Sequence, residues 1–470
     1  MMLLRTRAAL CAAFAASSLF AQSADRNPER WFVSLTDRAF DLTPYREALA
    51  NRVTATRMDD VVRELDANVR LDQAAVVAAV EDLGGTIHRQ GWIVNGLAVE
   101  LGAEAVNVLR RHPRVASVVA DSIRRPGIKT ATNAQNHATD LVQAMGIRGE
   151  GVTVAIIDSG VDASMGSSGR PHATFYRDGD PRNLTGGGIG GSRLLANIRI
   201  GAMQAEDFIN HGTPIAGVVA GARWNASAVA DDGHAPQARI VSYSVADDTF
   251  GGTWFTTLIS AWQRVAADKL RYDIQVANCS SQGFFGLASS GWGDQEALDA
   301  TAWLADILIT GMAGNDGSQM STFGYGATNM LAVGACDNDT RRVAAFSLRG
   351  PALANSGIRT AYPDLIGNGV GALAPSADDE MRTRMGSGTS FSAPQVAGAA
   401  ALYRSVRPTA SARETRAAIL ATTEDVLNAS ACRSHRAATR RGWFRPRPRR
   451  EHRHRLPRQF HRARGRRCRR

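Results

Sequence analysis

The sequence predicts an α/β protein with a doubly wound, mostly parallel sheet, preceded by a small ferredoxin-like α+β unit. From about residue 150, near-continuous apolar runs alternate with helical segments, as expected for parallel strands covered on both faces. Ahead of them, residues 31–121 follow the order strand, helix, strand, strand, helix, strand, which is the ferredoxin-like arrangement. With 470 residues and 44% hydrophobic content, the chain has room for two or three domains with a sizeable core.

The first 23 residues are typical of a secretory signal peptide. Arg5 and Arg7 give a positive start, residues 8–20 are largely apolar, and small residues within 19–23 suit cleavage. The apolar run is too short for a membrane-spanning helix, and no later segment is longer. We therefore expect a soluble protein that is secreted to the periplasm or the medium, without membrane association.

The ferredoxin-like unit is predicted from six segments and one insertion. Glycines end its first long helix at residues 84–85, as helix C-termini commonly require. The predicted strands are 31–36, 86–92, 93–101 and 114–121, the helices are 74–85 and 103–112, and an extra helix covers 58–70.

The larger domain is predicted from buried strands with helices between them. A glycine-rich stretch, 164–193, indicates a long flexible loop between two of its elements. The strands are 152–158, 238–245, 274–280, 307–314 and 330–336, and the helices include 214–222 and 254–269.

Three polar side chains stand where this fold places ligand sites. Asp158 ends a buried strand, at the sheet edge where doubly wound folds bind ligands. His211 opens a helix of small residues, and Ser390 lies at the start of an Ala- and Gly-rich helix. Alone, each suits an ordinary cap or loop role; together they can form a relay in which the imidazole takes the hydroxyl proton and the carboxylate orients the ring. Asp162 is a lesser candidate for the carboxylate because it does not follow the strand directly.

An anion-stabilising site is predicted next to Ser390. The N-terminus of its helix directs backbone N–H groups and a positive dipole end towards the hydroxyl, and Gly388 allows close approach of another backbone. Asn315 follows another buried strand, and its amide can donate to a developing oxyanion. An Asn-Asp turn is the alternative role for Asn315.

The flanks of these residues resemble the subtilase family of serine peptidases over roughly residues 130–430. They are VAIIDSGVD, NHGTPIAGVVAG, GMAGN and GTSFSAPQVAGAAAL, with the triad in the order Asp, His, Ser. The resemblance implies a serine endopeptidase in which Ser390 attacks, His211 is base and then acid, Asp158 orients it, and Asn315 binds the oxyanion. Pro214 and Gln395 replace histidines that are usual in the family, and neither belongs to the triad.

The resemblance also implies a domain order. Residues 24–130 would be a propeptide that acts as an intramolecular inhibitor by holding its last strand in the active-site cleft, with cleavage within the polar stretch 124–137. The alternative to a propeptide is that residues 24–130 form a stable accessory domain. Residues 131–432 would form the catalytic domain.

The strand that binds substrate backbone in the family corresponds to VANCSSQGFFG. It matches the usual pattern in either of two alignments, which leaves Ser280, Ser281 and Gly283 as candidates.

No cofactor is expected for catalysis, and the resemblance allows structural calcium. Asp178, Asp180, Asp231 and Asp232 offer oxygen ligands, although their spacing equally suits a solvated loop. Cys279, Cys336 and Cys432 allow one disulfide whose pairing the sequence leaves open. We expect a monomer that acts on protein or peptide substrates.

The net charge of +11 arises in an arginine-rich tail. Residues 433–470 contain 17 arginines and one acid, a local charge of +16, which leaves −5 for the other 432 residues. The tail lacks apolar periodicity and is predicted to be disordered. Lys129 and Lys269 are the only lysines, which indicates GC-rich coding DNA. Because a wrong reading frame through such DNA yields many arginines, we interpret the tail as the product of a frameshift.

Two alternatives depend on this tail: an inactive, poorly folded relic of a protease, or a basic arm that binds nucleic acid or an anionic surface. Deleting residues 433–470 distinguishes a binding role from a protease: the deletion would abolish binding, whereas a protease does not require the tail.

Overall fold

The computed structural model describes residues 26–36, 41–126, 139–224, 233–283, 293–315, 317, 327–337, 342–350, 352–354, 357–359, 362–425 and 442–444. The predicted signal peptide, Asp231, Asp232, Cys432 and most of the tail lie outside these residues. Within them, none of the helices has the length and apolar character needed to cross a membrane.

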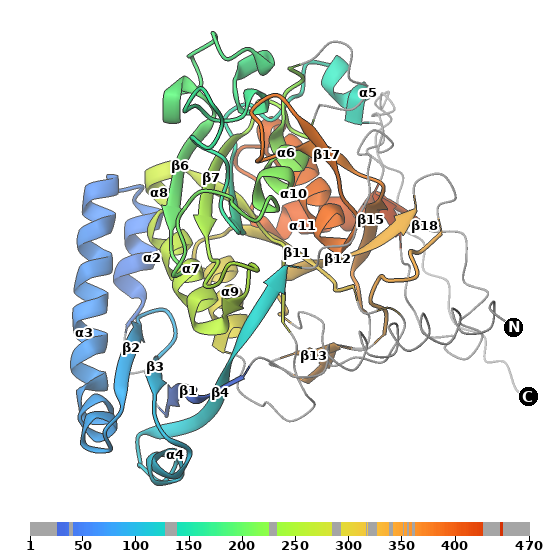
Figure 1. Cartoon of the computed structure of the whole chain (residues 1–470). Helices are drawn as coiled ribbons and strands as arrows, with labels where there is room; N and C mark the ends of the chain where they lie inside the picture. The colour runs from blue at the N-terminus through green and yellow to red at the C-terminus, as the bar shows by residue number, and fades with distance from the viewer. Residues whose placement is uncertain are drawn as a thin grey trace, which may run out of the picture.

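The N-terminal unit has the predicted ferredoxin-like arrangement. Its antiparallel sheet has the order β4-β1-β3-β2, so the first and last strands are neighbours, with helices on one side (Figure 1). The strands are β1 (Arg26–Leu35), β2 (Thr86–Gly91), β3 (Gly96–Glu100) and β4 (Val115–Pro126), and the helices are α2 (Thr43–Ala50), α3 (Ala55–Asp82) and α4 (Ala103–Leu109).

One helix of this unit differs from the prediction. The segments 58–70 and 74–85 were expected as two helices, but α3 is a single helix of 28 residues, and the extra helix is α2. The reason is a buried stripe that continues across the expected break at spacings of three and four residues, with the buried Gln73 in its middle. Gln73 donates to the Gly91 carbonyl (3.1 Å) and to Asn95 Oδ1 (3.1 Å), so the helix packs without interruption against the β2–β3 turn.

The larger domain contains the predicted doubly wound sheet. In the described part of the chain the strand order is β18-β19-β15-β12-β11-β9-β5-β7-β6, and every neighbouring pair from β19 to β6 is parallel. The strands from β5 onward are β5 (Thr153–Asp158), β6 (Leu194–Arg199), β7 (Arg239–Ser244), β9 (Ile274–Cys279), β11 (Leu308–Met312), β12 (Met330–Asp337), β15 (Leu365–Val370), β18 (Thr423–Asp425) and β19 (Gly442–Phe444).

Helices cover both faces of this sheet. Along β5, Val154 and Ile156 join the core beside α6 and α10, whereas Ala155 and Ile157 join the core beside α7 and α9. This explains the unbroken apolar runs in the sequence. The helices are α5 (Thr139–Ala144), α6 (Gly212–Ala220), α7 (Phe255–Ala267), α8 (Lys269–Tyr272), α9 (Gly293–Leu304), α10 (Thr389–Val406) and α11 (Ala412–Ala421).

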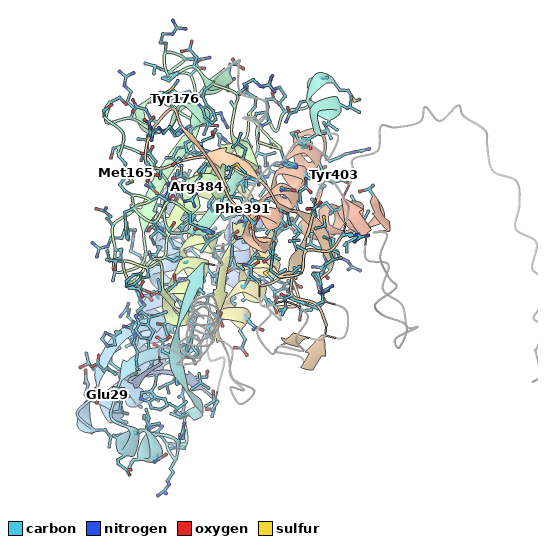
Figure 2. All side chains as sticks on the ribbon, turned by 45° about the vertical axis from the view of Figure 1, so that its right-hand side comes forward. Glu29, Met165, Tyr176, Arg384, Phe391 and Tyr403 are labelled. Carbon is cyan, nitrogen blue, oxygen red and sulfur yellow. The ribbon has the colours of Figure 1, made fainter. Side chains whose placement is uncertain are left out.

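Short elements complete the domain. The glycine-rich stretch 164–193 contains three single turns of 3-10 helix, and the edge strand β6 follows it. Figure 2 shows Tyr176 of this stretch at the opposite end of the molecule from Glu29 of β1. The remaining short elements are η3 (Ala173–Phe175), η4 (Arg177–Gly179), η5 (Ile189–Gly191), β8 (Thr253–Trp254), β10 (Ser281–Gly283), β13 (Ala352–Ala354), β14 (Gly357–Arg359), β16 (Leu373–Pro375) and β17 (Thr383–Met385).

The prediction that the tail is disordered is wrong for three of its residues. Gly442–Phe444 form β19, which pairs in parallel with β15 and antiparallel with β18. Trp443 and Phe444 have high β propensity in a segment otherwise rich in arginine. Their pairing protects the edge of β15, whose backbone groups would otherwise lack partners.

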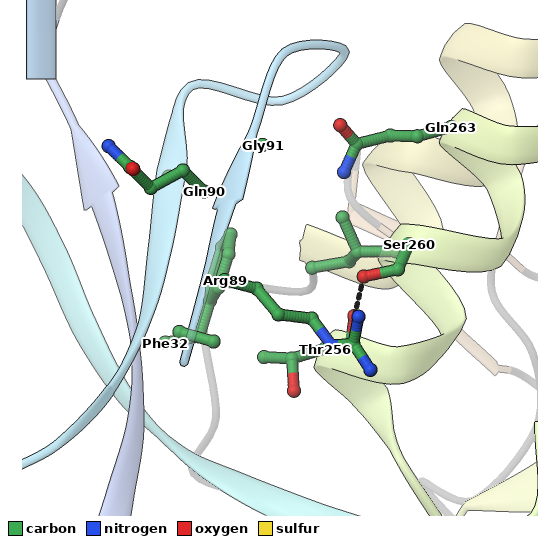
Figure 3. Close-up of a pocket in the computed structure, with 10 residues that line it drawn as sticks. Phe32, Arg89, Gln90, Gly91, Thr256, Ser260 and Gln263 are labelled. Atoms are coloured by element: carbon green, nitrogen blue, oxygen red, sulfur yellow. Dashed lines mark hydrogen bonds between the residues drawn. The ribbon is translucent and has the colours of Figure 1, made fainter. Parts of the chain in front are cut away.

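One hydrophobic cluster is shared by the two units, beside the cluster that each unit has of its own. Phe32, Tyr45 and Trp92 of the N-terminal unit belong to the same cluster as the buried face of α7. The side chains of β2 lie directly opposite α7, with a cavity of only about 10 Å³ between them (Figure 3). Gln263 of α7 accepts the backbone N–H of Trp92 through Oε1 at 2.7 Å.

Asp121 of β4 caps α7 from the N-terminal unit. Its carboxylate accepts the Phe255 backbone N–H (3.1 Å) and the Thr256 hydroxyl (2.6 Å), and it pairs with Arg30 Nε at 3.2 Å. A carboxylate at a helix N-terminus satisfies donors that have no partner within the helix. The contact therefore joins the last strand of one unit to a helix of the other.

Candidate active site

Asp158 and His211 meet at the carboxyl end of β5. His211 Nδ1 lies 2.6 Å from Asp158 Oδ1, and both side chains are buried. Two glycines permit this approach, since a Cβ on Gly160 would lie 2.0 Å from the Ala205 carbonyl oxygen, and one on Gly212 would lie 2.0 Å from that of Gly160. The glycines of the DSG and HGT motifs are thus required by close packing of the two loops.

The carboxylate fixes the state of the imidazole. Because Asp158 accepts, Nδ1 carries the proton, and Nε2 is buried without a hydrogen-bond partner among the described atoms. Burial alone would lower the pKa of His211, but the charge and hydrogen bond of Asp158, together with the charge of Asp207, raise that pKa above 6.5. The ring is therefore an oriented base with its Nε2 lone pair available.

Asp207 is a part of this site that the sequence analysis missed. Its carboxylate accepts the backbone N–H groups of His211 (3.1 Å) and Thr213 (2.7 Å) and the hydroxyl of Ser159 (2.7 Å). It thereby ties the first turn of α6 to the residue after Asp158. The available signal was an acid four residues before His211, at the start of a helix without a side-chain cap.

Asp162, the lesser candidate for the triad carboxylate, has a different environment. Its backbone N–H donates to the Thr213 hydroxyl (2.8 Å), and its Oδ1 accepts the Met165 N–H (2.8 Å). Burial raises the pKa of Asp162 to about 7. The geometry therefore favours Asp158 as the partner of His211.

Ser390 lies in the first turn of α10, the buried central helix. The ring of the following residue, Phe391, packs edge-on against His211 with 6.2 Å between ring centroids, which brings this turn to the imidazole. Gly388 precedes the helix with φ of 154°. Further along, Gln395 exchanges two hydrogen bonds with the backbone of Asn368, accepting at 3.1 Å and donating at 2.5 Å. Gln395 thus anchors α10 to β15.

Asn315 is held against the same turn. Its Oδ1 accepts the Thr389 backbone N–H (2.8 Å) and the Thr389 hydroxyl (3.0 Å), and that hydroxyl accepts the Gly314 N–H (3.0 Å). Since both donors approach the oxygen, the orientation of the amide is fixed, with its NH₂ group directed away from Thr389. The structure thus brings Asn315 to the helix that carries Ser390.

The candidates for substrate binding occupy two different places. Ser280 is buried, and its hydroxyl donates to the Ser390 carbonyl at 3.0 Å, so it holds the first turn of α10 in place. Ser281 and Gly283 belong to β10, which pairs antiparallel with β4 at Pro126 and Arg124. Of the two alignments, the geometry favours the one with Ser281 and Gly283 on the pairing strand.

The last strand of the N-terminal unit lies between two strands of the larger domain. β4 pairs with β10 through residues 124–126 and with β8 through Ile123 and Arg124, both antiparallel. Figure 1 shows β4 as a long arrow that leaves the N-terminal unit and reaches the larger domain. An extended segment from the N-terminal unit thus pairs through its backbone with two strands of the larger domain.

The candidate calcium ligands that the structure describes have protein partners instead. Asp178 accepts from Gln237 at 3.1 Å, and both oxygens of Asp180 accept from Arg182. No group of three or more His, Cys, Asp or Glu side chains suited to a metal ion occurs among the described residues. Asp178 and Asp180 thus have protein partners, and a structural calcium ion stays a prediction.

Cys279 and Cys336, two of the three cysteines that allow one disulfide, are not bonded to each other. Cys279 and Cys336 are buried thiols, and Cys336 Sγ donates to the Gly367 carbonyl. Cys432, the third candidate, lies outside the described residues.

Comparison with known proteins finds a matching family and relatives for the larger domain. The model of the subtilase family matches residues 149–443, which includes the first part of the arginine-rich tail. Subtilisin E of Bacillus subtilis (strain 168) is 27% identical over 335 residues, or 70% of this chain and 76% of the relative. Subtilisin DY of Bacillus licheniformis is 30% identical over 281 residues, or 59% and 85%. Alkaline elastase YaB of Bacillus sp. (strain YaB) is 24% identical over 400 residues, or 85% and 87%.

Proposed function

We propose, from the premise that this chain belongs to the subtilase family, that it is a secreted serine endopeptidase with Asp158, His211 and Ser390 as its catalytic triad. The observation that carries the proposal is the buried pair of His211 and Asp158, 2.6 Å apart, next to the helix turn that bears Ser390. In this pair the carboxylate fixes the tautomer and leaves Nε2 as the base.

The proposed reaction follows from these positions. His211 Nε2 takes the Ser390 hydroxyl proton while Oγ attacks the peptide carbonyl, and the oxyanion is stabilised by the Asn315 amide and the Ser390 N–H. The imidazolium then gives its proton to the leaving amine, which yields an acyl-enzyme and the first product. Water, deprotonated by Nε2, attacks the ester and releases the second product with the Ser390 hydroxyl restored. The buried Asp158 stabilises the imidazolium in both halves.

The N-terminal unit is proposed to be the propeptide and intramolecular inhibitor. In support, β4 pairs through its backbone with both β8 and β10, as an extended substrate would. His211 and Ser390 are both buried in the unprocessed chain, which supports a requirement for processing. Cleavage is expected within residues 124–137, and export depends on the predicted signal peptide.

An active-serine probe tests this function. A fluorophosphonate is expected to label the processed protein, and a Ser390→Ala variant with the same circular dichroism spectrum is expected to take no label and to remain unprocessed. Labelling of both proteins to the same extent would refute the assignment of the nucleophile. Ser392, buried two residues further along α10, offers a matched control, since Ser392→Ala should leave labelling intact.

A further inference from the structure

The residue directly before His211 is held by the β16–β17 hairpin. Asn210 donates through Nδ2 to Asp378 Oδ2 (2.6 Å) and to Ser376 Oγ (2.9 Å), and its Oδ1 accepts the Ala377 N–H (2.8 Å). Its backbone carbonyl accepts from the Arg384 guanidinium. The side-chain amide is thus bonded at both ends to a hairpin that lies more than 160 residues away in the sequence.

This contact determines an unusual backbone conformation. Asn210 has φ of +61°, a left-handed conformation that Asn tolerates better than most residues but that still costs roughly 1 kcal/mol. Such a conformation persists where the surroundings fix it. The next residue is His211, whose own N–H donates to Asp207. The main chain at His211 is therefore fixed by Asp207 on one side and by the hairpin on the other.

The hairpin also brings a positive charge to the imidazole. Charged groups on three elements act on His211: Asp158 at the end of β5, Asp207 before α6, and Arg384 on β17, which contacts the neighbouring Asn210 carbonyl. Figure 2 shows Arg384 and Phe391 in the central part of the molecule, and Phe391 packs against His211. The charge of Arg384 lowers the pKa of His211, against the two carboxylates that raise it. A single guanidinium thus holds the backbone beside the ring and opposes its protonation.

We propose that Asn210 and Arg384 are positioning residues for proton transfer at His211. Asn210 fixes the main chain from which the imidazole projects, and Arg384 fixes the Asn210 carbonyl directly before that ring. The inference depends on the proposed function, because it concerns the base of that reaction. It assigns a catalytic purpose to a hairpin that the sequence analysis did not single out.

The charge of Arg384 is tested by the pH dependence of kcat/KM on a small peptide substrate. Arg384→Met removes the charge at similar length, and we expect the acid limb of the profile to move to higher pH, because the guanidinium no longer opposes protonation of His211. Arg384→Lys keeps a cation and is the matched control, with the acid limb close to that of the parent. An unmoved limb in Arg384→Met, or an equal movement in both variants, would overturn the assignment, because a merely structural role lowers kcat without shifting the limb.

The role of Asn210 is tested by two substitutions. Asn210→Gly keeps access to positive φ but loses the amide, whereas Asn210→Ala loses both. We expect kcat to fall about tenfold in the alanine variant and less in the glycine variant, with KM changed less than twofold in each. Asp306, which also has positive φ (50°), provides the control, since Asp306→Ala should lower stability and leave kcat unchanged.

Active-site titration separates a failure of this inference from a failure of the proposed function. Active-site titration with the fluorophosphonate probe gives the fraction of competent enzyme in each preparation, and kcat is expressed per labelled site. An unlabelled parent would refute the protease assignment itself. A labelled parent with unchanged kcat in Asn210→Ala would refute the positioning role alone.

Discussion

Replacing Thr389 by valine should loosen the proposed oxyanion site and destabilise the fold by a predictable amount. The hydroxyl accepts the N–H of the buried Gly314 at 3.0 Å and donates to Asn315 Oδ1 at 3.0 Å. Valine has the same shape but neither function. An unsatisfied buried N–H costs about 1 to 3 kcal/mol, and a lost hydrogen bond about 0.5 to 1.5 kcal/mol. We therefore expect the free energy of unfolding to fall by about 2 to 4 kcal/mol.

The catalytic effect of this substitution should be smaller. Asn315 retains the bond from the Thr389 backbone N–H, at 2.8 Å, so the amide loses one of two restraints. Freeing part of one side chain costs roughly 1 kcal/mol, which corresponds to about a fivefold fall in kcat. A donor of this kind is worth roughly 3 to 4 kcal/mol in full, a magnitude measured in a subtilisin, and complete loss of Asn315 sets the upper limit.

Two measurements separate these effects. Unfolding is followed in denaturant with Ser390→Ala present in every protein, because self-digestion would otherwise distort the curves. The turnover number is measured in the active background and expressed per active site. Thr389→Ser keeps the hydroxyl and should retain nearly parental kcat and most of the stability. If Thr389→Val and Thr389→Ser behave alike in both assays, the hydroxyl does not orient Asn315 and the reasoning fails.

Two further predictions concern the packing of the site and the interface of the two units. Gly160→Ala should lower stability and activity severely, because its Cβ would lie 2.0 Å from the Ala205 carbonyl oxygen. The control is Gly187→Ala, also at positive φ but in open space, which should lower the free energy of unfolding by only about 1 kcal/mol and keep kcat. Equal effects of the two substitutions on kcat would contradict the packing argument. Burial raises the pKa of Asp121 from 3.8 to about 6, so the folded chain holds this proton more tightly, and the stabilisation present below pH 3.8 is lost as pH rises through about 6. The free energy of unfolding of the Ser390→Ala chain should therefore fall, between pH 3.8 and about 6, by on the order of 2 to 3 kcal/mol relative to the chain that also carries Asp121→Asn. Parallel pH profiles of the two chains would show that Asp121 does not titrate in that interval.

The sequence by itself determined the features that depend on short segments. Apolar runs long enough to cross a sheet predicted the parallel strands, and the element order of the N-terminal unit predicted its sheet order, because these patterns are local. The flanks of Asp158, His211 and Ser390 indicated the family for the same reason, since each motif is contained in one strand end or helix start. The structure confirms the fold class, and the site roles stay predictions that the experiments above address.

Only the tertiary structure decided what depends on residues far apart in the chain. It assigned Ser280 to the support of α10 and Ser281 with Gly283 to the strand that pairs with β4. It joined two expected helices into α3, since a buried stripe is defined by its partners, and it paired β19 with β15. It also revealed Asp207 and Asn210 around His211. Their polar groups are common in any loop, and only the folded chain shows which donors and acceptors they satisfy, because a hydrogen bond has no trace in sequence spacing when its partner lies on another element.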